Sequence, residues 1–303
     1  MKKRILVVTS SFDETVTYLT SKFSNSVKFF RINVDCISEY HINLYENGWE
    51  ILSDDFCIIK DDIDSIYYRK PAFPKLDEFE RKYWNLIKQD VYTLITGIIE
   101  SFEGKVLSKP SRLLVAENKA YQYLLVQKLN LLMPQSYIGN SIYFYNKFAD
   151  KDSIIKPLSQ GKVLSDYGNE LYFTSKLDND KSNINISKTP VYIQEKINKI
   201  YDVRIIVIDG FVFAIKIDAA GVLDWRVDYS NHQYSLITPP QDIVDECKKV
   251  LSCLSLSFGA FDYVVTQKNE WIFLEVNPNG QWLWLEQALK LNISEKIINY
   301  LTS

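Results

Sequence analysis

Cysteine is scarce in this sequence, and its cysteines are not arranged in pairs. Only four occur among 303 residues, and no two of them form a Cys-x-x-Cys motif. Disulfide frameworks and structural zinc sites both depend on dense or closely paired cysteines. The sequence therefore argues against both, and we expect Cys36, Cys57, Cys247 and Cys253 to be buried free thiols.

Histidine is also scarce, and the sequence has neither an excess of positive charge nor a long apolar run. With only His41 and His232, neither in a triad or metal motif, a histidine-dependent hydrolase has little material to work with. The 35 basic and 38 acidic side chains give a net charge of -3, so no global basic field exists to hold a nucleic acid. The apolar run from Ile5 ends at Ser10, and no later segment approaches the roughly eighteen apolar residues of a membrane span. These absences predict a soluble cytoplasmic protein with no nucleic-acid or membrane partner.

The sequence has ample material for packed cores. Apolar residues make up 47% of it and aromatic residues 14%, and at ~100–200 residues per domain the length suits about two domains. The expected order of strand (4–9), helix (12–23) and strand (27–34) is typical of a partly parallel sheet with helices on its faces. Further elements expected in this region are strands over 49–53, 56–60 and 65–69 and one long amphipathic helix over 76–101.

From residue 111 onward the pattern predicts helices and antiparallel hairpins. Asp209-Gly210, between apolar runs, is the strongest short-range signal for a hairpin. The expected elements are a helix over 115–130, a polar connection over 174–189, a hairpin of 203–208 with 211–217, a helix over 240–256 and a second hairpin of 260–265 with 271–276.

The last hairpin carries carboxylates inside apolar strands. Pairing Thr266 with Trp271 across the loop sets Asp262 opposite Glu275 on one face, and Asn277 projects to the same face. Two carboxylates and an amide oxygen suit Mg²⁺, which favours oxygen ligands together with substrate phosphates. The alternative is that they are ordinary polar residues of a half-exposed sheet, although apolar neighbours make a bare carboxylate costly. The residues alone leave both interpretations open.

Two other segments supply cations. Lys156 ends a strand-like run and is followed by the polar loop 159–161, which suits a position over phosphates. Arg204 enters an apolar strand and needs an anionic partner, either a phosphate or a metal-bound carboxylate. The structural alternatives are a surface turn at Lys156 and a salt bridge from Arg204 to Asp202 or Asp224.

The order of these residues resembles the ATP-grasp superfamily. The resemblance rests on Lys119, Ile155-Lys156-Pro157, Gln194-Glu195, Asp202-Val203-Arg204, Phe261-Asp262 and Leu274-Glu275-Val276-Asn277-Pro278-Asn279-Gly280. More narrowly, the chain resembles the ATP-grasp ribosomal-peptide maturases, the graspetide or microviridin-type synthetases. This narrower resemblance is carried by Tyr67-Tyr68-Arg69-Lys70-Pro71, Asp224-Trp225-Arg226 and the string from Glu275 to Trp284. The narrower resemblance covers almost the whole chain. Its C-terminal string is specific, whereas the individual lysines are not.

The resemblance implies a fold of mixed α/β and α+β class. In this ATP-grasp fold an N-terminal α/β domain precedes two α+β subdomains that sandwich ATP. The implied boundaries are 1–112 for the N-terminal domain, 113–193 for the central subdomain and 194–303 for the C-terminal subdomain.

The resemblance also implies roles for individual residues. Adenine is held at the hinge by Gln194, Glu195, Lys196 and Ile197, and Lys119, Lys156 and Asp202 complete the nucleotide-binding set. Asp262, Glu275 and Asn277 match the Mg²⁺ ligands. Arg204 faces the phosphates, and Asp224 and Arg226 meet the acceptor carboxylate of the peptide. Lys70 departs from the arginine common in the family, and we assign it no role beyond structure.

The implied activity is ATP-dependent macrocyclisation, in which side-chain ester or amide links form in a ribosomal precursor peptide with leader and core through an Asp or Glu acylphosphate. The implied cofactors are ATP and Mg²⁺. The alternative is another ATP-grasp carboxylate–amine ligase, which joins an amino acid to a small molecule or a protein terminus. A nucleotide-binding module without catalysis would lack some of Asp262, Glu275, Asn277 and Arg204, yet all four are present. The precursor, the type and number of links, and homo-oligomerisation stay open.

Overall fold

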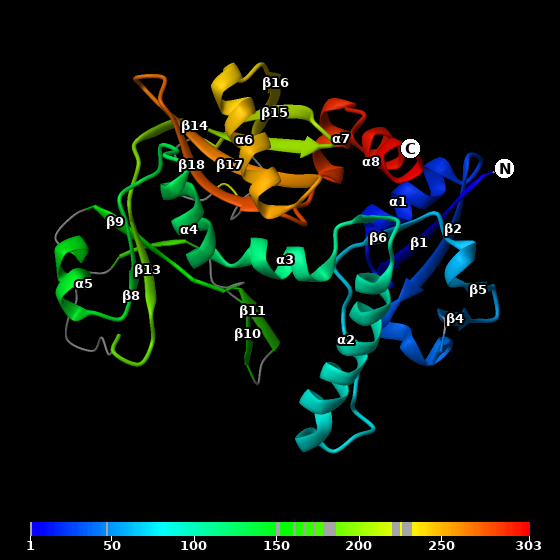
Figure 1. Cartoon of the computed structure of the whole chain (residues 1–303). Coiled ribbons are helices and arrows are strands. Elements are labelled where there is room, and N and C mark those ends of the chain that lie inside the picture. The colour runs from blue at the N-terminus through cyan, green and yellow to red at the C-terminus, as the bar shows by residue number, and fades with distance from the viewer. Residues whose placement is uncertain are drawn as a thin grey trace.

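The computed structural model describes residues 2–46, 48–149, 152–159, 162–165, 168–171, 174–177, 186–219, 225 and 232–303. In the described residues the N-terminal parallel sheet and the central antiparallel sheet lie on opposite sides of the molecule, with the large C-terminal sheet above and between them (Figure 1). Both chain ends lie on the side of the N-terminal sheet (Figure 1). This mixed α/β architecture confirms the expected fold class.

A parallel sheet forms the centre of the N-terminal region. Its order is β2-β1-β6-β7, built from β1 (Lys3–Thr9), β2 (Val27–Asn33), β6 (Ser65–Tyr68) and β7 (Lys105–Leu107). Alternate β1 residues face opposite layers, because Leu6 and Val8 share a core with α2 (Trp84–Ser101), whereas Ile5 and Val7 share one with α1 (Glu14–Phe23). An antiparallel sheet of β3 (His41–Tyr45), β4 (Gly48–Leu52) and β5 (Cys57–Ile59) lies beside it, and short 3-10 helices cover Val34–Glu39 and Lys60–Asp62.

Two helix predictions in this part of the chain are wrong in extent. The helix expected over 76–101 begins at Trp84, after a 3-10 turn over Arg81–Tyr83, and the Trp84 indole donates back to the Phe79 carbonyl at 3.0 Å. The helix expected over 115–130 is two helices, α3 (Pro110–Glu117) and α4 (Lys119–Lys128). The break lies at Asn118, whose side chain caps α4 by accepting from the Tyr121 N–H at 3.0 Å.

The central part has a sheet and a small core of its own. The sheet has the order β12-β9-β13-β8 and is antiparallel, built from β8 (Ser136–Gly139), β9 (Ser153–Lys156), β12 (Ser175–Lys176) and β13 (Val191–Glu195). The core consists of Tyr145 of α5 (Ile142–Ala149) packed with Leu177, Ile186 and Ile193. A separate hairpin consists of β10 (Lys162–Ser165) and β11 (Gly168–Leu171).

The C-terminal part is a large antiparallel sheet with helices. The order is β16-β15-β14-β17-β18, built from β14 (Lys199–Ile208), β15 (Phe211–Asp218), β16 (Gln233–Ile237), β17 (Phe258–Thr266) and β18 (Trp271–Asn277). The predicted turn joins β14 and β15, because Asp209 and Gly210 both have positive φ, 47° and 79°. The associated helices are α6 (Gln241–Leu254), α7 (Leu283–Leu289) and α8 (Ile293–Thr302).

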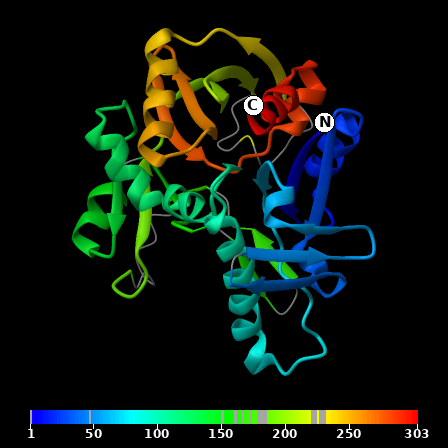
Figure 2. The same cartoon turned by 45° about the vertical axis from the view of Figure 1, so that its right-hand side comes forward.

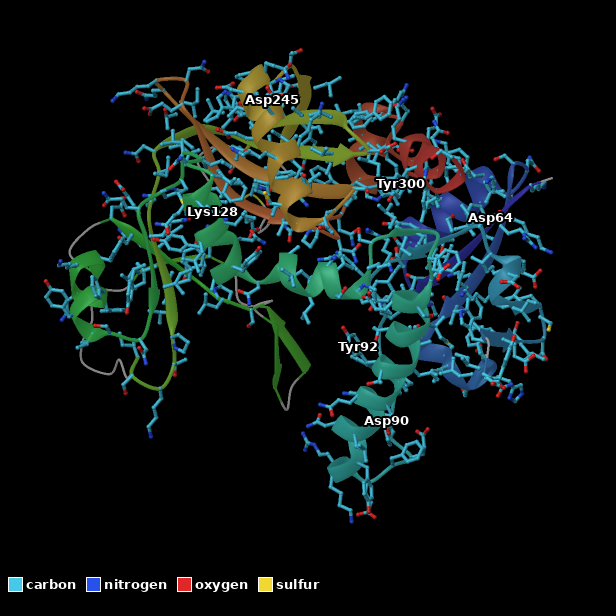
Figure 3. All side chains as sticks on the ribbon, in the orientation of Figure 1. Asp64, Asp90, Tyr92, Lys128, Asp245 and Tyr300 are labelled. Atoms are coloured by element: carbon cyan, nitrogen blue, oxygen red, sulfur yellow. The ribbon has the colours of Figure 1, made fainter. Side chains whose placement is uncertain are left out.

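The N-terminal region and the C-terminal sheet share a continuous core. Ile5 and Val7 of β1 belong to the same apolar cluster as Ile206 of β14, Trp282 and Ile297 of α8. Figures 1 and 2 both show α8 beside the N-terminal sheet. By contrast, Asp90 and Tyr92 lie on the half of α2 that projects away from the body (Figure 3). The N-terminal region is therefore fixed to the C-terminal sheet through packed side chains.

The cysteine prediction is only partly confirmed. All four cysteines are free, but only Cys247 is buried, whereas Cys36 is half-buried and Cys57 and Cys253 are exposed. Burial raises the pKa of the Cys247 thiol to about 12. In the part of the chain that the structure describes, no helix is both long enough and apolar enough to span a membrane.

Candidate functional site

The predicted carboxylate pair forms between β17 and β18 because of a bulge. Near the hairpin loop Val265 faces Trp271, so the expected pairing of Thr266 with Trp271 is wrong. The register shifts by one residue at Leu274, after which Asp262 lies opposite Glu275 and Ala260 opposite Asn277. A bulge turns the following side chains to the other face of a strand. This irregularity therefore puts both carboxylates in register.

Arg204 and Asp262 form a buried ion pair across β14 and β17. The two residues lie opposite each other in the sheet, and Arg204 Nη1 donates to both Asp262 carboxylate oxygens at 2.7 Å. The side chains are only 6% and 8% exposed. The structural alternative that paired Arg204 with Asp202 is wrong, because Lys199 Nζ binds both Asp202 oxygens at 2.8 and 2.6 Å.

The Lys119 ammonium offsets the negative charge of Glu275. Lys119, the first residue of α4, donates from Nζ to the Pro157 carbonyl at 2.9 Å and lies 4.0 Å from Glu275 Oε2. Like charges directly opposite each other on two strands repel. Arg204 and Lys119 therefore compensate the adjacent carboxylates of Asp262 and Glu275.

The backbone on either side of Glu275 is held by α4. Strand β18 is at the edge of its sheet, which leaves polar backbone groups without a strand partner. The buried Gln122 side chain supplies one, since it donates to the Val276 carbonyl at 2.9 Å and accepts from the Val276 N–H at 3.1 Å. Val276 lies between Glu275 and Asn277, so Gln122 fixes the positions of both. Gln122 was not predicted as a site residue, because a lone buried glutamine in a helix gives little signal in the sequence.

The donor atoms in this arrangement suit Mg²⁺. Among the described residues there is no group of three or more His, Cys, Asp or Glu side chains arranged to hold a metal. A cation here would therefore use the two carboxylates, the Asn277 amide oxygen and oxygen atoms of a bound substrate. That mixed set is one that Mg²⁺ accepts.

A cavity of about 280 Å³ adjoins the carboxylates, and we call it the hinge cavity. It lies between the end of β13 and the C-terminal sheet. Ile154, Ile197, Val264 and Leu274 give it apolar surface, while charged residues occupy the side of Asp262 and Glu275, a combination typical of ligand sites. The hinge cavity is lined by Pro134, Ile154, Lys156, Thr174, Gln194, Glu195, Lys196, Ile197, Asn198, Lys199, Asp202, Trp225, Asp262, Val264, Leu274 and Glu275.

The hinge cavity brings together most of the residues predicted to bind nucleotide. Gln194 is fully buried and donates to Ser136 Oγ at 3.0 Å and to Tyr192 Oη at 3.1 Å, so its side chain braces the strand end. Lys156 Nζ lies 5.8 Å from the centre of the Tyr192 ring. Burial first, and the negative charge of Glu275 to a lesser extent, raise the pKa of Tyr192 to about 12. Tyr192 is therefore a neutral wall beside Lys156.

The predicted acceptor residues Asp224 and Arg226 lie outside the described residues. Trp225 between them is described and buried, with 7% exposure. It lines the hinge cavity, and its ring lies 5.5 Å from that of Trp284 on α7. Trp225 thus lies where the hinge cavity meets α7.

Arg69 is a second residue that the sequence analysis left without a role. It is fully buried, and Nη2 donates to Gln281 Oε1 at 2.5 Å while Nη1 donates to Asn279 Oδ1 at 3.3 Å. Its Nε forms an ion pair with Asp13 at 3.3 Å. The available signal was an arginine directly after the buried strand β6, where an unpaired charge is costly. Arg69 joins the N-terminal sheet to the loop that follows Asn277.

The chain is similar to known proteins in its sequence and in its fold. The RimK-like ATP-grasp domain matches residues 116–301. A search among curated protein sequences found no match.

Several solved structures share the fold of the whole chain. A RiPP-associated ATP-grasp ligase of Chryseobacterium gregarium, solved with ADP and a leader and core peptide, is 22% identical with a TM-score of 0.87, covering 99% of this chain and 95% of that one. The macrocyclase MdnC of Microcystis aeruginosa, bound to precursor peptide MdnA, is 24% identical with a TM-score of 0.87, covering 98% and 99%. The ATP-grasp ligase PsnB with minimal precursor, Mg and ADP is 20% identical with a TM-score of 0.77, covering 98% and 96%.

The domain match extends over well more than half of the chain, from α3 to α8, and includes the whole hinge cavity and the carboxylate pair. The chain therefore belongs to the RimK-like ATP-grasp family.

Proposed function

We propose that this protein is an ATP-dependent ligase that closes side-chain ester or amide links in a ribosomally made precursor peptide. The observation that carries the proposal is the cluster of Arg204, Asp262, Glu275 and Asn277 at the edge of the hinge cavity. Such a cluster suits phosphoryl transfer, which depends on positioning and charge neutralisation more than on a protein nucleophile.

The chemistry proceeds in two balanced steps. A peptide Asp or Glu carboxylate oxygen attacks the terminal phosphorus of ATP, so that an acylphosphate forms and ADP leaves. A peptide hydroxyl or amine then attacks the acyl carbon, inorganic phosphate leaves, and the nucleophile loses its proton. The sum converts one ATP to ADP and phosphate and removes one water from the peptide for each link.

Each residue of the site has a proposed part in these steps. Lys119 and Lys156 bind phosphate oxygens, and the hinge residues Gln194, Glu195, Lys196 and Ile197 with Asp202 surround the nucleoside. Arg204, which pairs with Asp262 in the structure, would face the transferred phosphoryl group. Mg²⁺, when bound by Asp262, Glu275 and Asn277, would neutralise the phosphates. Asp224 and Arg226 are proposed to hold the acceptor carboxylate.

The peptide as substrate is supported by the neighbouring structures. Three solved structures with a similar fold are described with a leader and core peptide, with a precursor peptide or with a minimal precursor, and two of them also hold ADP. We extend this partner to the present chain because the similarity covers its N-terminal region as well as the ATP-grasp part. Proposed domain boundaries are 1–112, 113–193 and 194–303.

The test is mass spectrometry of a candidate precursor incubated with the protein, ATP and Mg²⁺. A short reading frame beside the gene, rich in Thr or Ser and in Asp or Glu, supplies the candidate. The proposal requires a loss of one water mass and release of one ADP per link, both abolished in Asp262→Asn. With free amino acids also present, a gain in mass by one amino acid less one water would instead establish the alternative carboxylate–amine ligase. ATP turnover without any change in peptide mass would refute peptide cyclisation.

A further inference from the structure

A second cavity of about 350 Å³ lies between the N-terminal region and α7, and we call it the N-terminal cavity. It shares no lining residue with the hinge cavity, but the two are adjacent, because Trp284 of one contacts Trp225 of the other. The N-terminal cavity is lined by Ser10, Phe12, Asp13, Glu14, Thr15, Lys70, Gln281, Leu283, Trp284 and Gln287.

One wall of this cavity is held in place by the buried Arg69. Its guanidinium contacts Asp13 at 3.3 Å, Gln281 at 2.5 Å and Thr15 at 3.5 Å, and all three of these residues line the cavity. Thr15 Oγ1 also donates to Gln281 Oε1 at 3.3 Å. The wall is thus built before any ligand binds, which lowers the entropic cost of binding.

The wall leaves hydrogen-bond donors for a ligand. The Gln281 atom that accepts from Arg69 and Thr15 is the amide oxygen Oε1. This orientation is required because the arginine side chain has only hydrogen-bond donors. The amide nitrogen of Gln281 is therefore the atom that does not face Arg69. Within the described ranges no hydrogen bond uses that nitrogen, and none uses the Lys70 ammonium, which also forms no ion pair there. The Asp13 carboxylate, in contrast, is occupied by Arg69, by the Thr9 hydroxyl and by the Val16 N–H.

The surroundings of the Lys70 ammonium favour the binding of an anion. More than a third of the residue is solvent-exposed, yet surrounding protein atoms still desolvate its ammonium. This desolvation first, and the positive charges of Arg69 and Arg204 next, lower the pKa of Lys70 to about 8. A carboxylate bound beside the ammonium would reverse this shift. Asp13 and Glu14 in the lining favour a singly charged carboxylate over a doubly charged phosphate.

We propose that the N-terminal cavity binds a non-reacting acidic side chain of the peptide substrate. Lys70 and the Gln281 amide nitrogen donate to its carboxylate, and Leu283 and Trp284 contact the adjoining peptide. The carboxylate is assigned as a non-reacting one because the N-terminal cavity shares no lining residue with the hinge cavity. This inference rests on the proposed function, and it assigns a specificity subsite for acidic sequence next to the reacting residue.

The test is protection of Lys70 from an amine-acylating reagent, read by mass spectrometry of the digested full-length protein. The probe is acetyl-Ala-Glu-Ala-amide, with acetyl-Ala-Gln-Ala-amide as its uncharged counterpart. The glutamate probe should slow acylation of Lys70 in a saturable way and leave Lys75, an exposed lysine nearby that does not line the cavity, unchanged. Equal protection by both probes, or none, would overturn the proposal. Protection by ADP and Mg²⁺ alone would assign the cavity to the nucleotide.

A kinetic test separates this inference from the proposed function. With a precursor that the protein modifies, Lys70→Gln should raise the KM for precursor about tenfold, the size of one lost charge-assisted hydrogen bond, with the KM for ATP unchanged. Lys75→Gln is the matched control and should leave both constants unchanged. An unaltered precursor KM in Lys70→Gln would refute the subsite while leaving cyclisation intact. Absence of any modified precursor would refute the function, and the protection assay would still decide whether the cavity binds a carboxylate.

Discussion

Gly280 is the position where one added methyl group should disturb the site most. It lies in the turn after β18, where its N–H donates to the Asn277 carbonyl at 3.3 Å. A Cβ at this position would lie 2.4 Å from the Ala260 Cβ, 2.8 Å from Arg204 Nη2 and 3.4 Å from the Asn277 Cβ. Ala260 is fully buried in the C-terminal sheet and has no room to retreat. The turn and the Arg204 guanidinium must therefore move apart in Gly280→Ala.

The Gly280→Ala substitution should lower both the stability of the protein and its affinity for ligands. Overpacking of a closed core typically destabilises a protein by about 1–3 kcal/mol, so the free energy of unfolding should fall by about 2 kcal/mol. The displaced atoms are also the functional ones, since Arg204 holds Asp262 and the turn carries Asn277. A loss of about 1.4 kcal/mol in their interactions with bound nucleotide and metal would weaken affinity tenfold.

Urea unfolding and calorimetric titration with ADP and Mg²⁺ measure the two effects. Gly97→Ala is the matched control, because Gly97 lies inside α2 with no atom within 4 Å of an added Cβ. Alanine is the better helix former, so the control should be stabilised by about 0.5–1 kcal/mol and should bind ADP normally. If Gly280→Ala were as stable as the wild type and bound ADP with the same affinity, the close contact between the turn and Arg204 would be wrong.

Three further predictions concern charged groups. Glu275→Gln keeps the side-chain size but removes a metal-binding charge, so turnover should be abolished with the circular dichroism spectrum unchanged; wild-type turnover would exclude Glu275 as a ligand. Arg204→Lys should weaken ATP binding or phosphoryl transfer, whereas Arg226→Lys should weaken precursor dehydration alone, and equal losses of ATP affinity would contradict separate roles. Burial alone would raise the pKa of Glu286, but hydrogen bonds from Ser294 and Lys22 outweigh it and lower the pKa. Above the unfolded pKa of about 4.3, the wild type should therefore be more stable than Glu286→Gln. This difference in the free energy of unfolding should disappear as the pH falls through the lower folded pKa. Unfolding curves of both proteins across acid pH measure it.

Local patterns in the sequence predicted the secondary structure where one short segment decided it. The turn at Asp209-Gly210 was predictable because few residues accept positive φ at both positions. The break at Asn118 was also local, since Asn is a favoured helix cap, but the apolar spacing on both sides concealed it. The start of α2 was placed too early because apolar residues of a preceding turn continued the helical spacing.

The carboxylate pair was predicted for a reason that was only partly correct. A regular hairpin with Thr266 facing Trp271 gives the pair of Asp262 and Glu275, and so does the observed register with one bulged residue at Leu274. A bulge inside an apolar strand has no sequence signal when the extra residue is itself apolar. Exposure of Cys57 and Cys253 was unpredictable for a similar reason, because it depends on which strand and helix faces remain uncovered after packing.

Arg69 shows most directly why part of the site cannot be predicted from local sequence. Its partner Gln281 is 212 residues away along the chain, and only the shared core between β1, α8 and the C-terminal sheet brings them together. A buried guanidinium is costly unless its donors are satisfied, so the Asp13 carboxylate and the Asn279 and Gln281 amides stabilise it jointly. The same contacts fix the turn after Asn277 relative to α1. The N-terminal region therefore takes part in the geometry of the proposed metal site through a charge that it buries, although it supplies no ligand to that site.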